Sequence, residues 1–227
     1  MSLKYSISYT AIFLLAFVHT THCFFFFSRP EPKKKISIMI DPYGDALQTG
    51  RKLHDSFERG ITLQIAEQIK ETLEHRFSNL KVLISRSPGD APTELQHASF
   101  ANRLNVDFYL HISCYEEQDT KSGIYVYQFS YGTNFITKIF DYALIPYDQA
   151  HIANSAKSSD WAISTKNSLE HQNWWRTKGP FKIPFKPLIG IHAPAIALEI
   201  GIMSNTAPLE YGQKIAISLI PSIEKIS

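Results

Sequence analysis

Two acidic residues are of interest, one inside an apolar run and one at the start of a helical segment. Glu199 lies inside an apolar run, residues 195–200, where an unpaired charge would be costly to bury. Pairing with an Arg or Lys would make this residue structural; otherwise its position indicates a site at the end of a strand. Glu58 begins a segment of helical periodicity, where an acid is also favoured simply by the helix dipole. Because carboxylates serve enzymes as proton carriers and metal ligands, these two residues are the first candidates for chemistry.

The composition is that of an ordinary folded domain. The chain has 227 residues, of which 44% are hydrophobic and 19% charged, enough to bury one core but short for two domains. Its net charge of +2 is small and its basic residues are dispersed, which argues against nucleic acid as a partner. The two cysteines, Cys23 and Cys114, form no CxxC pair, which excludes the common structural zinc and thioredoxin-like motifs.

The first 27 residues have the pattern of an export signal. A short basic start is followed by an apolar run over residues 9–18 and by an apolar patch at residues 24–27. This pattern predicts a cleaved signal peptide or, because no clear small-residue cleavage site follows, an N-terminal membrane anchor. Residues 28–35 form a basic linker with two prolines and three lysines. We therefore expect an exported protein (periplasmic, in the cell envelope or secreted) with a folded domain over residues 36–227.

Predicted strands and helices alternate along the folded domain. Apolar runs at residues 36–40, 81–85, 106–112, 123–130 and 195–200 predict strands, and helical periodicity covers residues 57–77, 93–104 and 206–226. Nearly continuous apolar strands are typical of a mostly parallel sheet with helices on both faces, so we predict a single α/β domain. Ligands of such folds bind beyond the carboxyl ends of the strands, where Asp41, Ser113 and Glu199 lie.

Five segments, in order, resemble motifs of the zinc-dependent N-acetylmuramoyl-L-alanine amidases of type 3, which are peptidoglycan hydrolases. The segments are residues 38–45 (IMIDPYGD), 57–66 (FERGITLQIA), 82–86 (VLISR), 100–113 (FANRLNVDFYLHIS) and 194–205 (PAIALEIGIMSN). They are similar to the family's Asp-Pro-Gly-His-Gly loop, its Glu-led helix, its Thr-Arg strand, its Ser-Ile-His stretch and its terminal strand with the catalytic Glu. Together they span almost all of the folded domain, so the resemblance implies the fold of this family.

The resemblance also implies a zinc site, from which this chain departs. In active members, two histidines and the helix-leading Glu hold zinc, and the terminal Glu acts as base on the zinc-bound water. By this correspondence Glu58 is the metal-binding carboxylate and Glu199 the catalytic one. The two histidine positions fall on Gly44 and Ser113, and neither residue is a good zinc ligand. Ser113 and Asn205 are then expected in binding.

Four residues are candidates to replace the lost imidazoles. One of them, Tyr43, lies near the first lost position but offers only a phenol, an uncommon zinc ligand. Asp45 adjoins the first lost position, so a modest backbone shift would bring its carboxylate toward a metal. His54 precedes Glu58 by four residues and would share its face if the helix began that early. His111 points to the same side of its strand as Ser113, but about 6–7 Å away. Both histidines also have plainer interpretations: His54 as an exposed residue near the helix start, and His111 as a hydrogen-bonded core residue.

Three functional hypotheses remain open. One is a zinc amidase with a rearranged metal shell, which hydrolyses the amide between N-acetylmuramic acid and L-alanine. Another is a pseudoenzyme that needs no cofactor and binds peptidoglycan or a cell-wall partner without cutting it. A third is an interaction protein, attached to the membrane by its N-terminal segment if that is retained. It would use the alternating aromatic residues Tyr125, Tyr127, Phe129 and Tyr131, although such a face more often packs in a core. Exposed tryptophans in the polar stretch 146–182 would also indicate glycan or partner contact.

Overall fold

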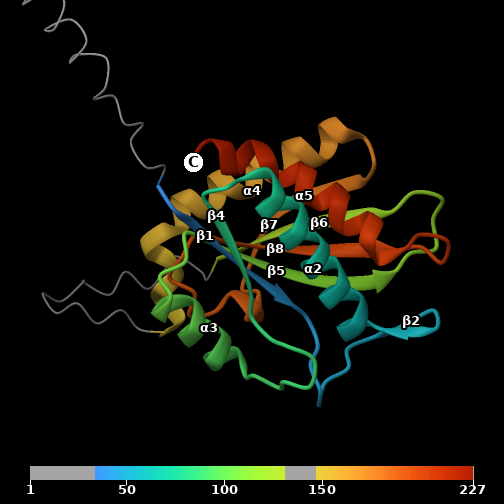
Figure 1. The fold of residues 1–227 in the computed structure, drawn as a ribbon, viewed down its shortest axis with the longest axis horizontal. Coiled ribbons are helices and arrows are strands. Elements are labelled where there is room, and N and C mark those ends of the chain that lie inside the picture. Colours follow the sequence, from blue (N-terminus) through green and yellow to red (C-terminus); the bar gives the residue numbers. More distant parts are fainter. Residues whose placement is uncertain (1–33, 131–146, 227) are drawn as a thin grey trace, which may run out of the picture. The chain divides into compact units, whose positions relative to one another are not determined.

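The protein is described by a computed structural model that covers residues 34–130 and 147–226 (Figure 1). The predicted signal or anchor of residues 1–27 and residues 28–33 of the linker lie outside the described residues, as does Tyr131. From Lys34 on, the chain forms one compact unit. None of the helices within the described ranges is long and apolar enough to cross a membrane.

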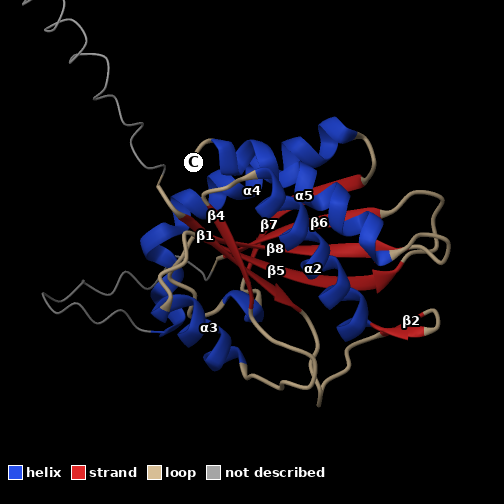
Figure 2. Ribbon diagram, viewed as in Figure 1, coloured by secondary structure: helices blue, strands red, loops and turns tan. Residues whose placement is uncertain are grey.

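Six strands form the main sheet, in the order β4-β1-β5-β8-β6-β7 (Figure 2). The strands are β1 (Ile36–Pro42), β4 (Leu80–Ile84), β5 (Phe108–Glu116), β6 (Gly123–Phe129), β7 (Arg176–Ile183) and β8 (Ala195–Ile202). Strands β4, β1, β5 and β8 are parallel to one another, whereas β6 is antiparallel to β8 and parallel to β7. The sheet is therefore mostly parallel, as predicted.

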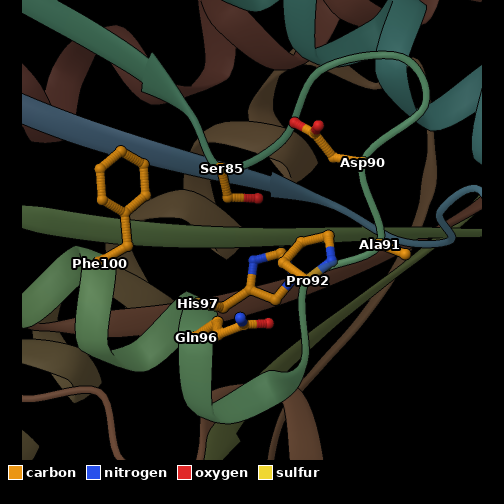
Figure 3. Close-up of a pocket in the computed structure, with 7 residues that line it drawn as sticks. All are labelled: Ser85, Asp90, Ala91, Pro92, Gln96, His97 and Phe100. Carbon is orange, nitrogen blue, oxygen red and sulfur yellow. The ribbon is translucent and has the colours of Figure 1, made fainter.

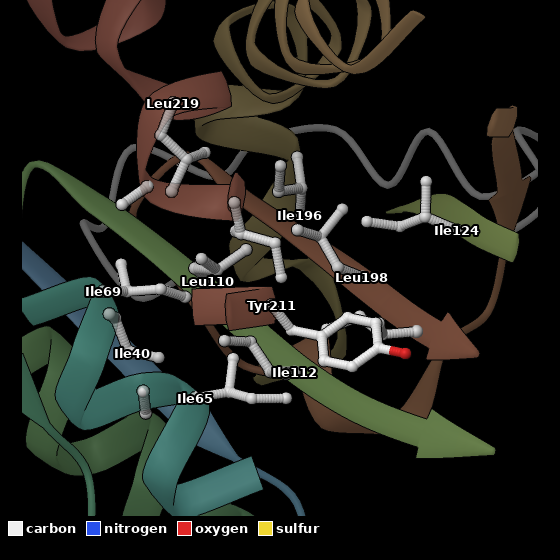
Figure 4. Close-up of a cluster of buried hydrophobic side chains, with 14 of the residues drawn as sticks. Ile40, Ile65, Ile69, Leu110, Ile112, Ile124, Ile196, Leu198, Tyr211 and Leu219 are labelled. Carbon is white, nitrogen blue, oxygen red and sulfur yellow. The ribbon is translucent and has the colours of Figure 1, made fainter. Parts of the chain in front are cut away.

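Helices cover both faces of this sheet. α2 (Glu58–Arg76), α4 (Ser155–Gln172) and α5 (Pro208–Glu224) pack on one face, against even-numbered apolar residues of the strands. Figure 4 shows part of this core, which includes Ile65 of α2, Tyr211 of α5 and Ile112 of β5. α3 (Glu94–Arg103) and the short 3-10 helix η2 (Lys186–Leu188) lie on the other face, which carries the odd-numbered strand residues. The predicted α/β fold is confirmed.

The polar stretch 146–182 is more regular than its sequence suggests. It forms the 3-10 helix η1 (Tyr147–Asn154), α4 and β7. The buried stripe of α4 includes small or hydroxylated residues such as Ser158 and Thr165, which hides its helical periodicity. Trp161 stacks on Phe108 with ring centroids 3.7 Å apart, and Trp175 is also buried. These two tryptophans belong to the core and give no indication of ligand contact.

Candidate functional site

One face of the sheet carries several of the residues that the sequence singled out. Ser113 of β5 pairs in register with Glu199 of β8, which in turn pairs with Tyr125 of β6. His111 lies two residues before Ser113 and pairs with Asp41 of β1. Because side chains alternate along a strand, all five belong to the face opposite α2, α4 and α5. Strand β5 continues to Glu116, so Ser113 lies inside the strand rather than at its end.

Glu58 is buried, and backbone groups occupy its carboxylate. The residue is only 1% exposed; its Oε1 accepts a hydrogen bond from the N–H of Cys114 (2.7 Å), and its Oε2 accepts one from the N–H of Arg51 (3.0 Å). Gly50 allows this close approach, since a Cβ at that position would come 2.8 Å from Glu58 Oε2. Glu58 therefore ties the start of α2 to the end of β5 and to the loop that precedes the helix.

Glu199 is held by one cation and one phenol. Its Oε1 accepts a hydrogen bond from Arg51 Nη1 at 2.8 Å, and its Oε2 accepts one from the hydroxyl of Tyr127 at 3.0 Å. Partial burial would lower the pKa of Arg51, but the hydrogen bond and charge of Glu199 outweigh this effect and raise it. Burial, followed by the same carboxylate, raises the pKa of Tyr127. Arg51 thus neutralises the charge of Glu199.

Arg51 is the residue at which the two predicted acids meet. Its backbone N–H binds Glu58, and its Nη1 binds both Glu199 and the carbonyl oxygen of Cys114 (2.9 Å). Sequence reasoning missed Arg51, because it lies in a loop, outside any motif, 148 residues from Glu199. The only signal was the alternative that Glu199 pairs with an Arg or Lys. That alternative describes the contact in this structure.

Hydrogen bonds within the loop at Gly44 and Asp45, where the first histidine of the family is expected, hold that loop in place. Asp45 caps its own turn, since its Oδ1 accepts hydrogen bonds from the N–H groups of Leu47 (2.7 Å) and Gln48 (2.6 Å). Gly44 has a φ of +81°, and a Cβ there would lie 2.8 Å from the Cβ of Arg59. The backbone at this position therefore suits glycine and leaves no space for a larger side chain.

His54 does not share a helical face with Glu58, because α2 begins only at Glu58. It lies instead in the turn of a short hairpin formed by β2 (Lys52–Leu53) and β3 (Ser56–Phe57). Its Nε2 is 3.1 Å from the carbonyl oxygen of Ile202, at the end of β8. His54 thus fastens the hairpin to the main sheet.

His111 is a buried residue held by a carboxylate. It is 2% exposed, and its Nδ1 lies 2.7 Å from Asp41 Oδ2; its Nε2 has no hydrogen-bond partner in the described structure. Asp41 also accepts a hydrogen bond from the Ser85 hydroxyl (2.7 Å) and has His97 Nδ1 at 3.0 Å. Burial would raise the pKa of Asp41, but the two histidines outweigh it and hold the pKa well below its ordinary value. Asp41 thus braces three elements.

A pocket of about 350 Å³ opens beside this cluster (Figure 3). Side chains of α3, including His97 and Phe100, lie on one side of it, and Ser85 and Asp90 come from the segment between β4 and α3. Asn205, predicted to take part in binding, is exposed in the turn after β8, where its Oδ1 accepts a hydrogen bond from Thr206. Neither Asn205 nor the residues that form the acid–Arg51 contacts line this pocket.

The donor set around Arg51 does not fit zinc. Catalytic zinc sites use three protein ligands, most often with histidine nitrogen among them. Here Gly44 has no side chain, Ser113 offers only a hydroxyl, and both oxygens of Glu58 already accept backbone hydrogen bonds. Within residues 34–130 and 147–226, no three His, Cys, Asp or Glu side chains are grouped so that they could hold one metal ion. A guanidinium, itself a cation, contacts Glu199 instead.

Comparison with known proteins places the fold. Residues 38–216 match the model of the N-acetylmuramoyl-L-alanine amidase family of type 3. The N-acetylmuramoyl-L-alanine amidase CwlM of Bacillus licheniformis is 28% identical over 92 residues, which are 40% of this chain. That match covers 36% of CwlM, so the chain spans only about a third of this relative.

Solved amidase structures resemble the whole folded part. An N-acetylmuramoyl-L-alanine amidase from Clostridium difficile 630 has a TM-score of 0.63 at 16% identity and covers 85% of this chain and 97% of its own. AmiC2 of Nostoc punctiforme has a TM-score of 0.62 at 16% identity, with 86% and 98% covered. At such identities the likeness establishes the fold alone. Because the family model matches most of its length, the chain belongs to the type 3 N-acetylmuramoyl-L-alanine amidase family.

Proposed function

We propose that this protein binds peptidoglycan and does not cleave it by zinc hydrolysis. The observation that carries the proposal is the contact of Arg51 with both acids on which the family's zinc chemistry would depend. Arginine keeps its charge at any physiological pH, so its guanidinium cannot accept a proton, and its positive charge disfavours a metal ion beside Glu199. A site organised around this cation is suited to holding a polar ligand.

The occupied carboxylates support this proposal. Zinc hydrolysis needs a metal that lowers the pKa of its water to about 7 and a carboxylate that carries the proton. Both oxygens of Glu199 already accept hydrogen bonds, from Arg51 and Tyr127, and both oxygens of Glu58 accept backbone N–H groups. A metal cation that bound Glu199 would have to share its carboxylate with the positive charge of Arg51, which repels it.

Peptidoglycan is the ligand that family membership favours. The relatives are named for an amide that joins N-acetylmuramic acid to L-alanine. The N-terminal pattern predicts export, which would bring the protein to the cell wall. Retention of this fold without its metal ligands is consistent with selection for binding rather than turnover.

A metal-dependent amidase with a rearranged shell is the second candidate, and His111 favours it. Zinc-binding histidines commonly donate one ring N–H to a carboxylate and keep the other nitrogen for the metal. His111 has this arrangement, with Nδ1 on Asp41 and a buried Nε2 that has no partner within the described ranges. A metal there would still need two further ligands, which the described side chains do not supply together.

Purified sacculi distinguish these candidates. The full chain is incubated with sacculi in the presence of zinc; bound protein is measured by sedimentation, and released stem peptide by mass spectrometry. The proposal predicts that the wild type binds sacculi and that neither the wild type nor Glu199→Gln releases stem peptide. Release by the wild type that disappears in Glu199→Gln would establish hydrolysis and overturn the proposal. Absence of binding to sacculi would overturn it as well.

A further inference from the structure

A group of aromatic rings extends from Glu199 across strands β6 and β7. Tyr127 stacks on Phe185 with ring centroids 5.2 Å apart and an interplanar angle of 4°, and it lies 5.7 Å from Phe181. Tyr125 stacks on Tyr127 at 6.5 Å and on Phe181 at 6.5 Å. We call these four residues, Tyr125, Tyr127, Phe181 and Phe185, the aromatic ladder.

The aromatic ladder is only partly covered. Phe181 is 41% exposed, and the other three side chains are half-buried, unlike the fully buried strand residues of the opposite face. The ladder is continuous with the candidate site, because the hydroxyl of Tyr127 donates to Glu199. Lys178, whose Nζ lies 5.5 Å from the ring centre of Tyr125, adds a cation at one end. Flat apolar surfaces thus alternate with hydroxyl and charged groups.

We propose that the aromatic ladder binds the pyranose rings of a glycan strand, with Glu199 and Arg51 contacting the polar groups of the same ligand. This inference rests on the proposed peptidoglycan-binding function and specifies which part of the polymer the protein holds. Sugar rings have an apolar C–H face that stacks on aromatic side chains and a rim of hydroxyls that hydrogen-bond to carboxylates and phenols. The ladder and its adjoining ion pair offer both kinds of contact side by side.

A protein partner fits this surface less well. At the edge of the sheet that carries the ladder, a second copy would pair with strand β7, where Pro180 supplies no N–H. Lys178 and Lys182, both on this strand, are charges that discourage such pairing. A dry protein interface would also have to bury the Arg51–Glu199 pair, which costs desolvation energy. A glycan leaves this pair hydrated or hydrogen-bonded.

The test uses soluble glycan strands from which the stem peptides have been removed, with free stem peptide as the second probe. Binding to the full chain is measured by isothermal titration calorimetry. Phe181→Ala is expected to weaken binding to the bare glycan by about 3- to 10-fold, the range for loss of one aromatic contact. Ile217→Ala on α5 is the control, because Ile217 is 38% exposed, close to Phe181, and lies on a helix that covers the opposite face of the sheet, so binding should be unchanged. Tyr127→Phe separates the ring from its hydroxyl and should retain most of the stacking.

Three outcomes would overturn the inference. If the protein binds sacculi and stem peptide but not bare glycan, the ladder is not a glycan site, although the proposed function stands. If it binds neither sacculi nor glycan, both proposals fail together. If Phe181→Ala changes the sedimentation coefficient of the protein rather than its glycan affinity, a second copy occupies the ladder. Thermal unfolding of each variant verifies that a loss of binding does not reflect loss of the fold.

Discussion

Arg51 Nη1 lies 2.8 Å from Glu199 Oε1, although 148 residues separate the two positions in the chain. The loop that carries Arg51 is held by Glu58 through a backbone hydrogen bond, so both acids contribute to placing one guanidinium. The carboxylate that the resemblance predicts to be catalytic is therefore half of an ion pair. In the proposed function, the Arg51–Glu199 pair contacts the polar groups of a bound ligand.

Coupling between Arg51 and Glu199 can be measured directly. A double-mutant cycle of Arg51→Ala and Glu199→Ala should give about 0.5–1 kcal/mol of unfolding free energy, as expected for a partly exposed pair. The side chains are 53% and 21% exposed, so the coupling should also decrease between low and high salt. The pair Arg76–Glu224, whose side chains are 61% and 51% exposed and 3.6 Å apart, serves as control and should couple more weakly. A coupling of zero at low salt would contradict the geometry.

Glu58 is predicted to be a stability residue. Glu58→Ala leaves the N–H groups of Arg51 and Cys114 without their acceptor, at about 1–3 kcal/mol for each buried donor. Urea unfolding should therefore show a loss of about 2–4 kcal/mol, given that one donor is only partly buried. Glu67→Ala, an exposed position on the same helix, should change stability little. Equal effects of the two substitutions would show that the Glu58 carboxylate is not structural.

Stability at low pH should depend on Asp41. The folded pKa of Asp41 is lowered, so its contribution is fully present above the unfolded value of about 3.9 and is lost as the pH falls through the folded pKa. Below about pH 4, the unfolding free energy of the wild type should fall more steeply than that of Asp41→Asn. Urea midpoints measured between neutral and acid pH test this difference. Parallel curves for the two proteins would contradict it.

Restoring histidine at Gly44 should not restore a metal site. The φ of +81° and the crowding by Arg59 predict that Gly44→His loses about 1–2 kcal/mol or more of stability. Gly89→His is the matched control, because Gly89 has a φ of +92° but nothing within 4 Å of a Cβ. It therefore shares the backbone strain without the crowding, and thermal unfolding should show a smaller loss. A zinc-stabilised Gly44→His protein would contradict the account of this loop.

Apolar patterning was sufficient to predict the fold class, a single α/β domain with a mostly parallel sheet. Runs such as residues 36–40 and 195–200 are buried on both sides in the sheet, so their composition alone indicates central parallel strands. Patterning was less informative where polar residues are buried. Strand β5 was predicted to end at residue 112, because Ser113 and Tyr115 interrupt the apolar run, yet it extends to Glu116. Helix α4 was not predicted, because some of its buried side chains, such as Ser158 and Thr165, are polar.

The site was less predictable than the fold because it depends on long-range contacts. The resemblance to family motifs identified Glu58 and Glu199, and only Glu199 is unusual for its apolar surroundings. Nothing local marks Arg51, since its role arises only when the loop before α2 reaches the end of β8. The partners of His111 were similarly hidden: its strand position was predicted, but the neighbouring Asp41 carboxylate was not recognised as its partner. Contacts between distant segments of the chain therefore determine the surroundings of Glu199 and of His111.

Zinc content tests the central claim most directly. The purified full chain is dialysed to equilibrium against buffered zinc, and the bound metal is measured by elemental analysis, alongside Arg51→Ala. The account predicts far less than one zinc per chain in the wild type and no gain in the variant, because no group of zinc ligands occurs within residues 34–130 and 147–226. One tightly held zinc per wild-type chain, lost in His111→Ala, would contradict it and favour a rearranged amidase.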